Sequence, residues 1–470
     1  MHTIEQIFIN GEFVTPHGTE RFDLYNPATA QVIGQVRLAD EVDAERAIAA
    51  AKAAFPAWSR TTKQERIVAL KRMHAAVAAR HDDLLEAVIE EYGAPASRSA
   101  WMASYPAEVI AQAIEALEAF EFETTAGAAT VQMTPLGVAG LITPWNSDAG
   151  FICGKLAAAL AAGCTAVIKP SEMSALQTQI VTEALRDAAL PPGVFNIVTG
   201  RGDTVGETIS RHPDVAKISF TGSTNTGKAI LRNAAESFKR VTLELGGKSP
   251  TILLDDVDLA QAIPLVIQAG FMNSGQACVA GTRILVPQAR KAEIETALAQ
   301  AVAAVKSGDP RNSTTDVGPM VSEKQWLRVQ GYIRKGLEEG ARLLAGGEGR
   351  PDGTRDGWFV RPTLFADVNN QMTIARDEIF GPVLCVIPYR DEAEAIAIAN
   401  DTDYGLSAVV LGGADRARRV AQQIVSGRVL VNTLAHEPKA PFGGFKHSGV
   451  GREMGEWGIS AFMEPRSVLG

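Results

Sequence analysis

Cysteine and histidine are scarce in this sequence, and neither occurs at the spacings of a metal site or a disulfide framework. The 4 cysteines (Cys153, Cys164, Cys278 and Cys385) form no C-x-x-C pair, and the 7 histidines form no H-E-x-x-H pair. We therefore predict no bound metal and a reducing compartment, the cytoplasm.

Long apolar runs and basic segments are also missing. The longest uninterrupted apolar run, LAAALAAGCTAVI between Lys155 and Lys169, has 13 residues, whereas a membrane-spanning helix needs about 20. The N-terminal stretch MHTIEQIFINGEF lacks the apolar core of a signal peptide. The net charge is −9 without a long basic run, so we predict neither nucleic acid nor a membrane as a partner.

What the sequence contains is the composition of a compact soluble protein, with 46% hydrophobic and 21% charged residues. Its 470 residues exceed what one hydrophobic core usually supports. We therefore expect two or three domains.

The sequence pattern changes near residue 136. Before this point, after a short β opening, it is mainly helical, and a helix with a Thr62–Glu65 capping box is predicted to continue to Gly93. After it, apolar runs such as VAGLIT, TAVIK and AKISF alternate with helical segments, and a second alternating region covers about 246 to 440. Such alternation predicts an α/β fold with mostly parallel sheets, whose ligands lie beyond the carboxyl ends of the strands.

The stretch FTGSTNTGKA, residues 220 to 229, is nearly a nucleotide-triphosphate loop. Such a loop needs Ser or Thr after Lys228 to ligate magnesium, and this sequence has Ala229 there. A strand-like run enters the turn and a helix-compatible run leaves it, so its backbone N–H groups can still attract a pyrophosphate without a metal. From these residues alone, a plain loop is favoured over the phosphate site of a kinase or ATPase.

Three residues are candidates for chemistry, each with an ordinary alternative. Cys278, among the small residues of NSGQACVAG, is either a nucleophile or a small buried apolar side chain. Glu244, in the apolar run VTLEL, is either a general base with a raised pKa or one half of a salt bridge. Asn146, after the run VAGLIT, is either a donor to an oxyanion or a turn residue.

Two charged or aromatic pairs are less specific when taken singly. Lys169 and Glu172 of KPSE follow a strand-like run and read as exposed charges. Glu378 and Phe380 of DEIFGP read as a turn residue and a core aromatic. Taken without the other motifs, neither pair indicates a function.

Together these motifs resemble one family, the NAD(P)-dependent aldehyde dehydrogenase superfamily, over nearly the whole chain. The matching stretches occur in the family's order: TPWN (143–146), KPSE (169–172), FTGSTNTG (220–227), LELGGKSP (243–250), FMNSGQAC (271–278), DEIFGP (377–382) and PFGGFKHSGVGRE (441–453). This resemblance implies an aldehyde dehydrogenase-like α/β fold, with a Rossmann-type cofactor domain, a second α/β catalytic domain and a small β oligomerisation element. The implied boundaries are 1–118 with 138–245 for the cofactor, 246–440 for catalysis, and 119–137 with 455–470 for oligomerisation.

The resemblance also implies an enzyme that oxidises a small-molecule aldehyde to a carboxylic acid. In this reading Cys278 is the nucleophile that forms a thiohemiacetal and then a thioester, and Glu244 activates the hydrolytic water. The side chain of Asn146 and the backbone N–H of Cys278 stabilise the oxyanion, and Lys155 corresponds to a lysine near the base.

The family's cofactor contacts fall on the other motifs and answer the question raised by FTGST. The turn lies beneath the dinucleotide, with Ser223 at the pyrophosphate and Thr221 and Gly222 near the nicotinamide, so phosphate is bound and not transferred. Lys228 is then a helix lysine. The full implied set is Thr143, Trp145, Lys169, Ser171, Glu172, Thr221, Gly222, Ser223, Gly246, Glu378 and Phe380. Glu172, which grips the adenine ribose with Lys169, repels a 2′-phosphate, so NAD is expected over NADP.

The chain departs from many relatives in two places near the family's substrate tunnel. Ser147, Asp148 and Ala149 follow Asn146 where an aromatic residue and a proline are common, and Gly154 replaces a common tryptophan. We expect a wider and more polar entrance, which Met272 and Phe442 also line. Arg466 stands where a lysine is frequent.

Three other functions and an assembly are weighed beside this reading. A CoA-acylating semialdehyde dehydrogenase generally lacks the base that Glu244 provides, and a thiol esterase without redox chemistry has no use for the cofactor motifs. A catalytically silent structural or binding protein on this fold has no need to retain Cys278, Glu244 and Asn146 together. By analogy with the family, the stretch 120–137 and the tail from about 458 join subunits into a homodimer or homotetramer.

Overall fold

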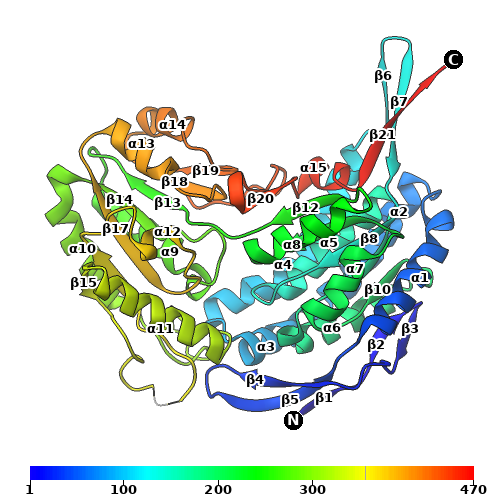
Figure 1. Ribbon diagram of the computed structural model, residues 1–470, viewed down its shortest axis with the longest axis horizontal. Coiled ribbons are helices and arrows are strands. Elements are labelled where there is room, and N and C mark those ends of the chain that lie inside the picture. The colour runs from blue at the N-terminus through cyan, green and yellow to red at the C-terminus, as the bar shows by residue number, and fades with distance from the viewer. Residues whose placement is uncertain (355) are drawn as a thin grey trace.

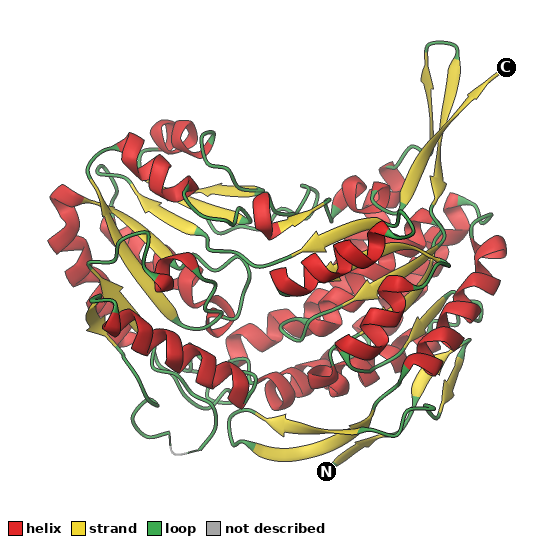
Figure 2. Cartoon of the chain, in the orientation of Figure 1, coloured by secondary structure: helices red, strands yellow, loops and turns green. Residues whose placement is uncertain are grey.

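The chain forms two large sheets covered by helices and two smaller sheets (Figure 1). The structure, a computed structural model, describes residues 1–354 and 356–470. Helices and strands alternate along most of it, as the cartoon in Figure 2 shows. The predicted α/β class is confirmed.

The first large sheet has 8 strands, and its central five run parallel. Every residue of β8 and β9 is buried, as expected for a parallel sheet with helices on both faces. From edge to edge the strands are β20 (Gly449–Val450), β12 (Arg240–Glu244), β11 (Val215–Thr221), β8 (Val138–Ile142), β9 (Thr165–Lys169), β10 (Phe195–Ile197), β2 (Ile7–Ile9) and β3 (Glu12–Val14).

Helices cover both faces of this sheet, and an apolar cluster fills each interface. One cluster joins α2, α4, α5 and α6 to the strands, and the other joins α1, α7 and α8 to the opposite face. The helices are α1 (Glu41–Trp58), α2 (Lys63–Ala78), α3 (His81–Ala87), α4 (Ala96–Ala119), α5 (Asp148–Ala162), α6 (Ala175–Asp187), α7 (Glu207–Arg211) and α8 (Thr224–Ala235).

The predicted helix from Thr62 to Gly93 is correct at its start and wrong in its continuity. Thr62 and Glu65 form the expected capping box. The helix ends at Ala78, and the chain continues through α3 and a π-helical turn, Val88–Tyr92, before Gly93. At the break Arg80 leaves helical geometry, and its side chain pairs with Asp83 and Glu183 of two other helices. Tertiary contacts thus interrupt a segment whose local sequence favours one helix.

The second large sheet has 7 strands, all parallel except β15. Its strands are β15 (Arg342–Ala345), β16 (Thr363–Ala366), β17 (Val383–Tyr389), β14 (Arg283–Pro287), β13 (Pro250–Leu253), β18 (Ser407–Leu411) and β19 (Arg428–Val431). Its helices are α9 (Leu259–Phe271), α10 (Lys291–Ala304), α11 (Glu323–Glu338), α12 (Thr373–Arg376), α13 (Glu392–Asn400) and α14 (Ala414–Ala421).

Two three-stranded sheets complete the structure. One, at the N-terminus, consists of β1 (His2–Ile4), β5 (Gln31–Arg37) and β4 (Arg21–Asn26). The other joins the hairpin β6 (Glu123–Ala126) and β7 (Ala129–Pro135) to the C-terminal strand β21 (Met463–Leu469), which follows α15 (Gly455–Ser460). Figure 1 shows this second sheet projecting away from the body of the molecule.

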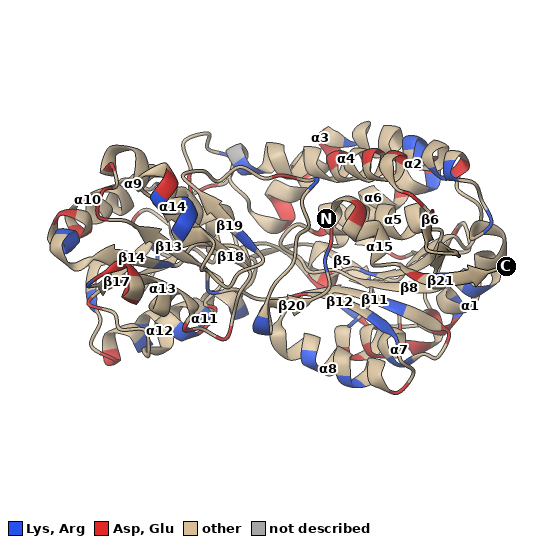
Figure 3. Ribbon diagram, turned by 90° about the horizontal axis from the view of Figure 1, so that it is seen from above, with Lys and Arg blue, Asp and Glu red and all other residues tan. Residues whose placement is uncertain are grey.

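Charged residues of both signs are interspersed over the two halves of the molecule (Figure 3). Among the described residues, no helix has the length and apolarity needed to cross a membrane.

The parallel strands of the first sheet bring the predicted cofactor motifs to one edge. β11 ends at Thr221, β12 at Glu244 and β9 at Lys169, and Thr143 directly follows β8. Because carboxyl ends of parallel strands meet at the same edge of a sheet, these residues gather there. Strand β20, from the end of the chain, pairs with β12, so that Gly449 lies opposite Glu244.

Candidate active site

Cys278 follows a loop with unusual backbone geometry. After α9, the residues Asn273, Ser274 and Gly275 have φ values of 54°, 59° and 73°. A Cβ on Gly275 would lie 2.2 Å from the carbonyl carbon of Gly381, so only glycine fits there. Left-handed conformations at non-glycine residues are strained and persist only where surrounding contacts hold them. The N–H of Gly318, which donates to Ser274 Oγ at 2.9 Å, is one such contact.

Asn146 lies against this loop, as the motif resemblance implies. Its Nδ2 donates to the carbonyl oxygen of Gln276 at 3.1 Å, and Asn273 Nδ2 donates back to the carbonyl of Asn146 at 3.1 Å. These bonds use one of the two N–H groups of the Asn146 amide and fix the side chain beside Cys278. The strand that ends before Asn146 and the nucleophile loop are thereby held together.

The Cys278 thiol is half-buried, and its surroundings disfavour the thiolate. Burial raises the pKa of Cys278 to about 12, and the negative charges of Glu378 and Glu244 act in the same direction. The positive charge of Arg428 partly opposes them. Without a bound ligand, the sulfur is therefore a neutral thiol at neutral pH.

Glu244 ends β12 as a buried carboxyl group. Neither of its oxygens has a hydrogen-bond partner among the described residues. Burial raises its pKa well above the ordinary value, Glu453 raises it further, and Lys155 and Arg452 lower it. A buried carboxyl group without partners favours its neutral form. Its raised pKa suits an acid–base group that works near neutral pH.

Lys155, from α5, belongs to a small polar network beside Glu244. Its Nζ lies 2.5 Å from Glu453 Oε1 and donates to Ser219 Oγ at 3.0 Å. Ser219 Oγ in turn donates to the same Glu453 oxygen at 2.9 Å. Lys155 therefore acts on Glu244 through its charge, while its direct partners are Glu453 and Ser219.

The FTGST turn has the form of a phosphate-binding helix start. Ser223 caps α8, with its Oγ accepting from the N–H of Thr226 at 3.2 Å. Gly222 N–H donates to the carbonyl of Glu244 at 3.0 Å, which ties the turn to the strand of the base. Thr221 Oγ1 is buried without a hydrogen-bond partner among the described residues. Exposed N–H groups at the start of α8 and a free hydroxyl fit a dinucleotide. Lys228 lies exposed within α8.

Glu172 is placed between two cations. Lys169 Nζ lies 3.3 Å from Glu172 Oε2 and also donates to the carbonyl of Pro170 at 2.7 Å. Arg201 Nη1 lies 3.5 Å from Glu172 Oε1, and its Nη2 and Nε donate to Glu20 Oε1 at 2.7 and 3.0 Å. This KPSE pair, which reads from the sequence as exposed charges, includes a buried lysine.

Glu378 and Phe380 bring the DEIFGP motif to the same place. Glu378 Oε1 accepts from the N–H of Gly247 at 2.9 Å, and a Cβ on Gly246 would lie 2.5 Å from Oε2. Phe380, at φ 60°, packs edge-on against Trp145 with ring centroids 5.5 Å apart. A Cβ on Gly247 would lie 2.3 Å from the carbonyl oxygen of Cys278. Gly246 and Gly247 thus lie between the carboxyl group of Glu378 and the backbone of Cys278.

Comparison with known proteins agrees with this arrangement. A model of the Aldehyde dehydrogenase family matches residues 13–468. The chain belongs to the aldehyde dehydrogenase family. The family prediction is confirmed, whereas the roles and domain boundaries given above for individual residues stay predictions.

Several relatives of this aldehyde dehydrogenase are similar over their full length. A 3-succinoylsemialdehyde-pyridine dehydrogenase of Pseudomonas is 44% identical, covering 100% of this chain and 99% of that protein. A putative aldehyde dehydrogenase of Staphylococcus aureus is 45% identical, with 98% of each chain covered.

Solved structures of aldehyde dehydrogenases superimpose closely on this chain. Aldehyde dehydrogenase C of Pseudomonas syringae, a cysteine-to-alanine mutant with NAD⁺ and octanal, has a TM-score of 0.98 at 43% identity, covering 100% of this chain and 97% of that one. The Mycobacterium tuberculosis aldehyde dehydrogenase with NAD⁺ has a TM-score of 0.96 at 40% identity, covering 99% and 98%.

One expectation about this aldehyde dehydrogenase is wrong. Asp148 was expected to make the substrate entrance more polar, but its side chain is fully buried. Its oxygens accept from Thr143 Oγ1 at 2.9 Å and Thr178 Oγ1 at 2.8 Å. Burial raises the pKa of Asp148 to about 7, against the lowering effect of these hydroxyls, of the Lys169 charge and of the Ser171 N–H. Asp148 therefore accepts hydrogen bonds from two predicted cofactor residues, Thr143 and Ser171. The extra width expected at Gly154 stays a prediction, and a Cβ there would meet Val109 at an ordinary 3.7 Å.

Three residues of the site were not identified from the sequence: Glu453, Ser219 and Arg428. Glu453 closes the motif PFGGFKHSGVGRE, and this position was the only available signal. Ser219 is an ordinary strand residue in AKISF, and Arg428 belongs to GRVLVN, where nothing in the pattern sets it apart.

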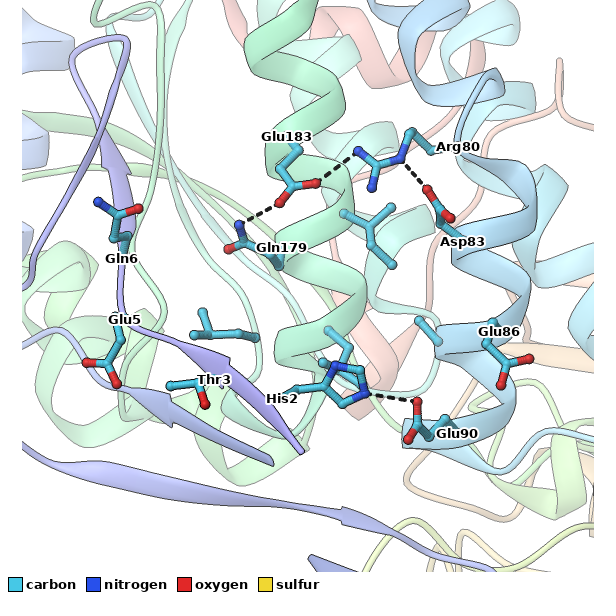
Figure 4. Close-up of a pocket in the computed structure, with 14 residues that line it drawn as sticks. His2, Thr3, Glu5, Gln6, Arg80, Asp83, Glu86, Glu90, Gln179 and Glu183 are labelled. Atoms are coloured by element: carbon cyan, nitrogen blue, oxygen red, sulfur yellow. Dashed lines mark hydrogen bonds and ion pairs between the residues drawn. The ribbon is translucent and has the colours of Figure 1, made fainter. Parts of the chain in front are cut away.

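A pocket of about 550 Å³ opens elsewhere, between β1, α3 and α6 (Figure 4). Several of its charged side chains pair with one another: Arg80 binds Asp83 and Glu183, and His2 lies 3.2 Å from Glu90. It contains none of the predicted site residues. The described residues also contain no group of three or more His, Cys, Asp and Glu that could hold a metal ion.

Proposed function

We propose that this aldehyde dehydrogenase oxidises an aldehyde to a carboxylic acid with NAD, through a thioester on Cys278. The observation that carries this proposal is the location of Cys278. Its carbonyl touches Gly247, whose N–H holds Glu378, and the Glu244 carboxyl, which has no hydrogen-bond partner among the described residues, acts on the pKa of Cys278. A nucleophile, an acid–base group and the predicted cofactor residues therefore converge on one sulfur.

The chain's own residues can carry the remaining chemistry. The Cys278 thiol gives up its proton to solvent, its sulfur adds to the aldehyde carbon, and the N–H groups of Asn146 and Cys278 stabilise the resulting oxyanion. Bound NAD accepts the hydride that leaves this carbon, which converts the thiohemiacetal to a thioester. The ionised form of Glu244 then takes a proton from water, the hydroxide attacks the thioester, and the acid leaves as that proton passes to the Cys278 sulfur.

The cofactor proposal rests on the fit of the predicted residues. The N–H groups at the start of α8, and the Thr221 hydroxyl, which has no hydrogen-bond partner among the described residues, suit a pyrophosphate and its neighbouring ring. Glu172, with Lys169 beside it, suits a ribose hydroxyl and repels a 2′-phosphate. NAD is therefore the preferred cofactor, and NADP is the poorer one.

The projecting sheet supports a homodimer or homotetramer. β6 is exposed at all four positions, and β21 carries the exposed apolar residues Val468 and Leu469. Exposed apolar residues on a projecting strand favour contact with another copy of the chain.

Two variants test the reaction by following NADH formation from NAD and an aldehyde. Cys278→Ala should abolish NADH formation. Glu244→Gln should retain a first burst of one NADH per active site and lose about 10²- to 10⁴-fold in steady turnover, because only hydrolysis needs the base. Undiminished turnover by Cys278→Ala contradicts the proposal. If CoA restored the turnover of Glu244→Gln, and if the wild-type enzyme also needed CoA for turnover, the results would favour a CoA-acylating enzyme.

A further inference from the structure

One side of helix α11 holds the DEIFGP turn, residues 377 to 382. Gln325 Nε2 donates to the carbonyl oxygen of Phe380 at 2.7 Å, and Arg328 Nη2 donates to the carbonyl oxygen of Glu378 at 2.6 Å. Residues three and four apart lie on the same side of a helix. These hydrogen bonds therefore bring one side of α11 against the backbone of the turn that carries two predicted cofactor residues.

Val329, on the same side of α11, packs directly against this turn. Its side chain is fully buried. A Cβ on Gly381 would lie 2.5 Å from Val329 Cγ2 and 3.0 Å from Cγ1, whereas carbon atoms in contact are ordinarily about 3.5 to 4.0 Å apart. Gly381 does not have a positive φ. The side chain of Val329, and not the backbone conformation, is therefore what requires a glycine at position 381.

Gly381 also touches the nucleophile loop, residues 273 to 278. A Cβ on Gly275 would lie 2.2 Å from the carbonyl carbon of Gly381 and 2.6 Å from the nitrogen of Pro382. The backbones of the two segments are thus packed too closely for any side chain to fit between them. A displacement of Gly381 therefore reaches the loop that carries Cys278.

The DEIFGP turn needs such support because its backbone is strained. Phe380 has a φ of 60°, and left-handed conformations at non-glycine residues persist only where surrounding contacts hold them. Gln325 bonds to the carbonyl oxygens of Phe380 and Ile379, at 2.7 and 3.2 Å. These hydrogen bonds hold the turn to α11, and the side chain of Val329 limits how closely the turn approaches the helix.

We propose that Val329 is a positioning residue for hydride transfer: its contact with Gly381 places the DEIFGP turn and, through Gly275, the nucleophile loop. This inference rests on the proposed function and adds a residue that acts through its neighbours. A methyl group on Gly381 would have to move from 2.5 Å to about 3.5 Å from Val329 Cγ2. A misplacement of about 1 Å between reacting groups can reduce a rate about 100-fold.

The test measures the rate of the first NADH burst by stopped flow, at saturating NAD and with the aldehyde that wild type oxidises fastest in a panel of aliphatic and aromatic aldehydes. Gly381→Ala should lower this rate about 10- to 100-fold. Val329→Ala should lower it less, because the hydrogen bonds from α11 still hold the turn. In the double variant the nearest remaining atom of residue 329 to the added methyl group is Cβ, at an ordinary 3.4 Å. The double variant should therefore be faster than either single variant.

Two further measurements separate positioning from a general loss of stability. With an aldehyde deuterated at its carbonyl carbon, the isotope effect on the burst should be larger in Gly381→Ala than in wild type, because hydride transfer is the step that is slowed. Gly336→Ala is the matched control on the same helix. A Cβ there would lie 3.0 Å from Ile374 and 3.1 Å from Phe365, away from the turn, so the burst rate should stay unchanged even if the Tm falls.

The outcomes separate this inference from the proposed function. A wild-type burst rate in Gly381→Ala or in Val329→Ala, or a double variant slower than Gly381→Ala, overturns the positioning role. If Gly381→Ala does not fold, the double variant is compared with Val329→Ala, and an equal or slower burst in the double variant overturns the role. In all these cases wild type still forms NADH through Cys278, and the proposed function stands. Absence of NADH from wild type with every aldehyde would instead contradict the proposed function itself.

Discussion

The carboxylate of Glu378 lies so close to Gly246 that no side chain fits between them. A Cβ on Gly246 would be 2.5 Å from Glu378 Oε2, while the N–H of Gly247 donates to Oε1 at 2.9 Å. Burial raises the pKa of Glu378 to about 7, and this backbone bond lowers it. The two glycines therefore set the position of a carboxyl group predicted to hold the cofactor.

Replacing Gly246 with alanine should weaken NAD binding. The added methyl group displaces Glu378, so we expect at least about a tenfold increase in the Kd for NAD, measured by titration calorimetry. Gly331→Ala in α11 is the matched control, because a Cβ there meets nothing within 4 Å. Equal affinities in both variants would show that Glu378 does not depend on Gly246 for its position.

Cys278 should react slowly with an alkylating reagent until NAD is bound. With its pKa raised to about 12, few molecules carry a thiolate at pH 8, so iodoacetamide labelling should be at least about tenfold slower than that of a free cysteine. A cationic nicotinamide ring nearby stabilises the thiolate and should accelerate labelling. Mass spectrometry of the Cys278 peptide measures both rates. Fast labelling without NAD would mean that the surroundings do not suppress ionisation.

Asp148→Asn should stabilise the protein at alkaline pH more than at acidic pH. The unfolded carboxyl group loses its proton near pH 4, whereas in the folded protein it keeps the proton up to about pH 7. Wild-type stability contributed by this group is therefore lost as pH rises from about 4 to 7. We expect the variant's Tm to exceed that of wild type by about 2 °C or more at pH 8, and by less at pH 4. The exposed Asp187→Asn on α6 is the control, and an equal effect of both substitutions would refute the burial argument.

Glu172→Gln should move cofactor preference toward NADP. Removing the negative charge leaves Lys169 and Arg201 free to meet a 2′-phosphate, so the kcat/KM ratio of NADP to NAD should rise about tenfold or more. Glu20→Gln also removes a carboxylate from Arg201 but leaves Glu172 intact. If both variants gain NADP activity equally, the discrimination comes from Arg201 and not from Glu172.

Val468→Glu should dissociate the assembly through the projecting sheet. Val468 is 45% exposed on β21, and a charge there is unfavourable in an apolar subunit contact. Light scattering after size exclusion should show a smaller species. Val425→Glu, at a position of similar exposure (41%), is the control and should keep the wild-type mass. Unchanged mass for Val468→Glu would place the subunit contact elsewhere.

The sequence was most informative where a residue belongs to an ordered motif at a strand end. Thr221, Glu244 and Lys169 end parallel strands, so the alternating pattern alone predicts that they meet. Their predicted neighbours, Glu378 and Cys278, come from the other sheet's loops, and only the family resemblance connected them.

Residues that act through distant tertiary contacts were not predictable. Asp148 looked like a tunnel residue because of its neighbours in sequence, yet two threonines and the fold around them bury it. Arg428 has no local signal, because its effect on the pKa of Cys278 depends on how two distant segments of the chain pack together. The end of the helix at Ala78 also arises from tertiary contacts.

The pairing of β20 with β12 has a consequence for biosynthesis. While the protein is being made, β12 has an open edge until residue 450 leaves the ribosome, because its partner is the last strand of that sheet to be translated. The strand that carries Glu244 is thus the exposed border of a nearly complete sheet while residues 245 to 450 are translated. Unprotected strand edges pair readily with other chains. Nascent or truncated chains that end before Gly449 should therefore depend strongly on chaperones.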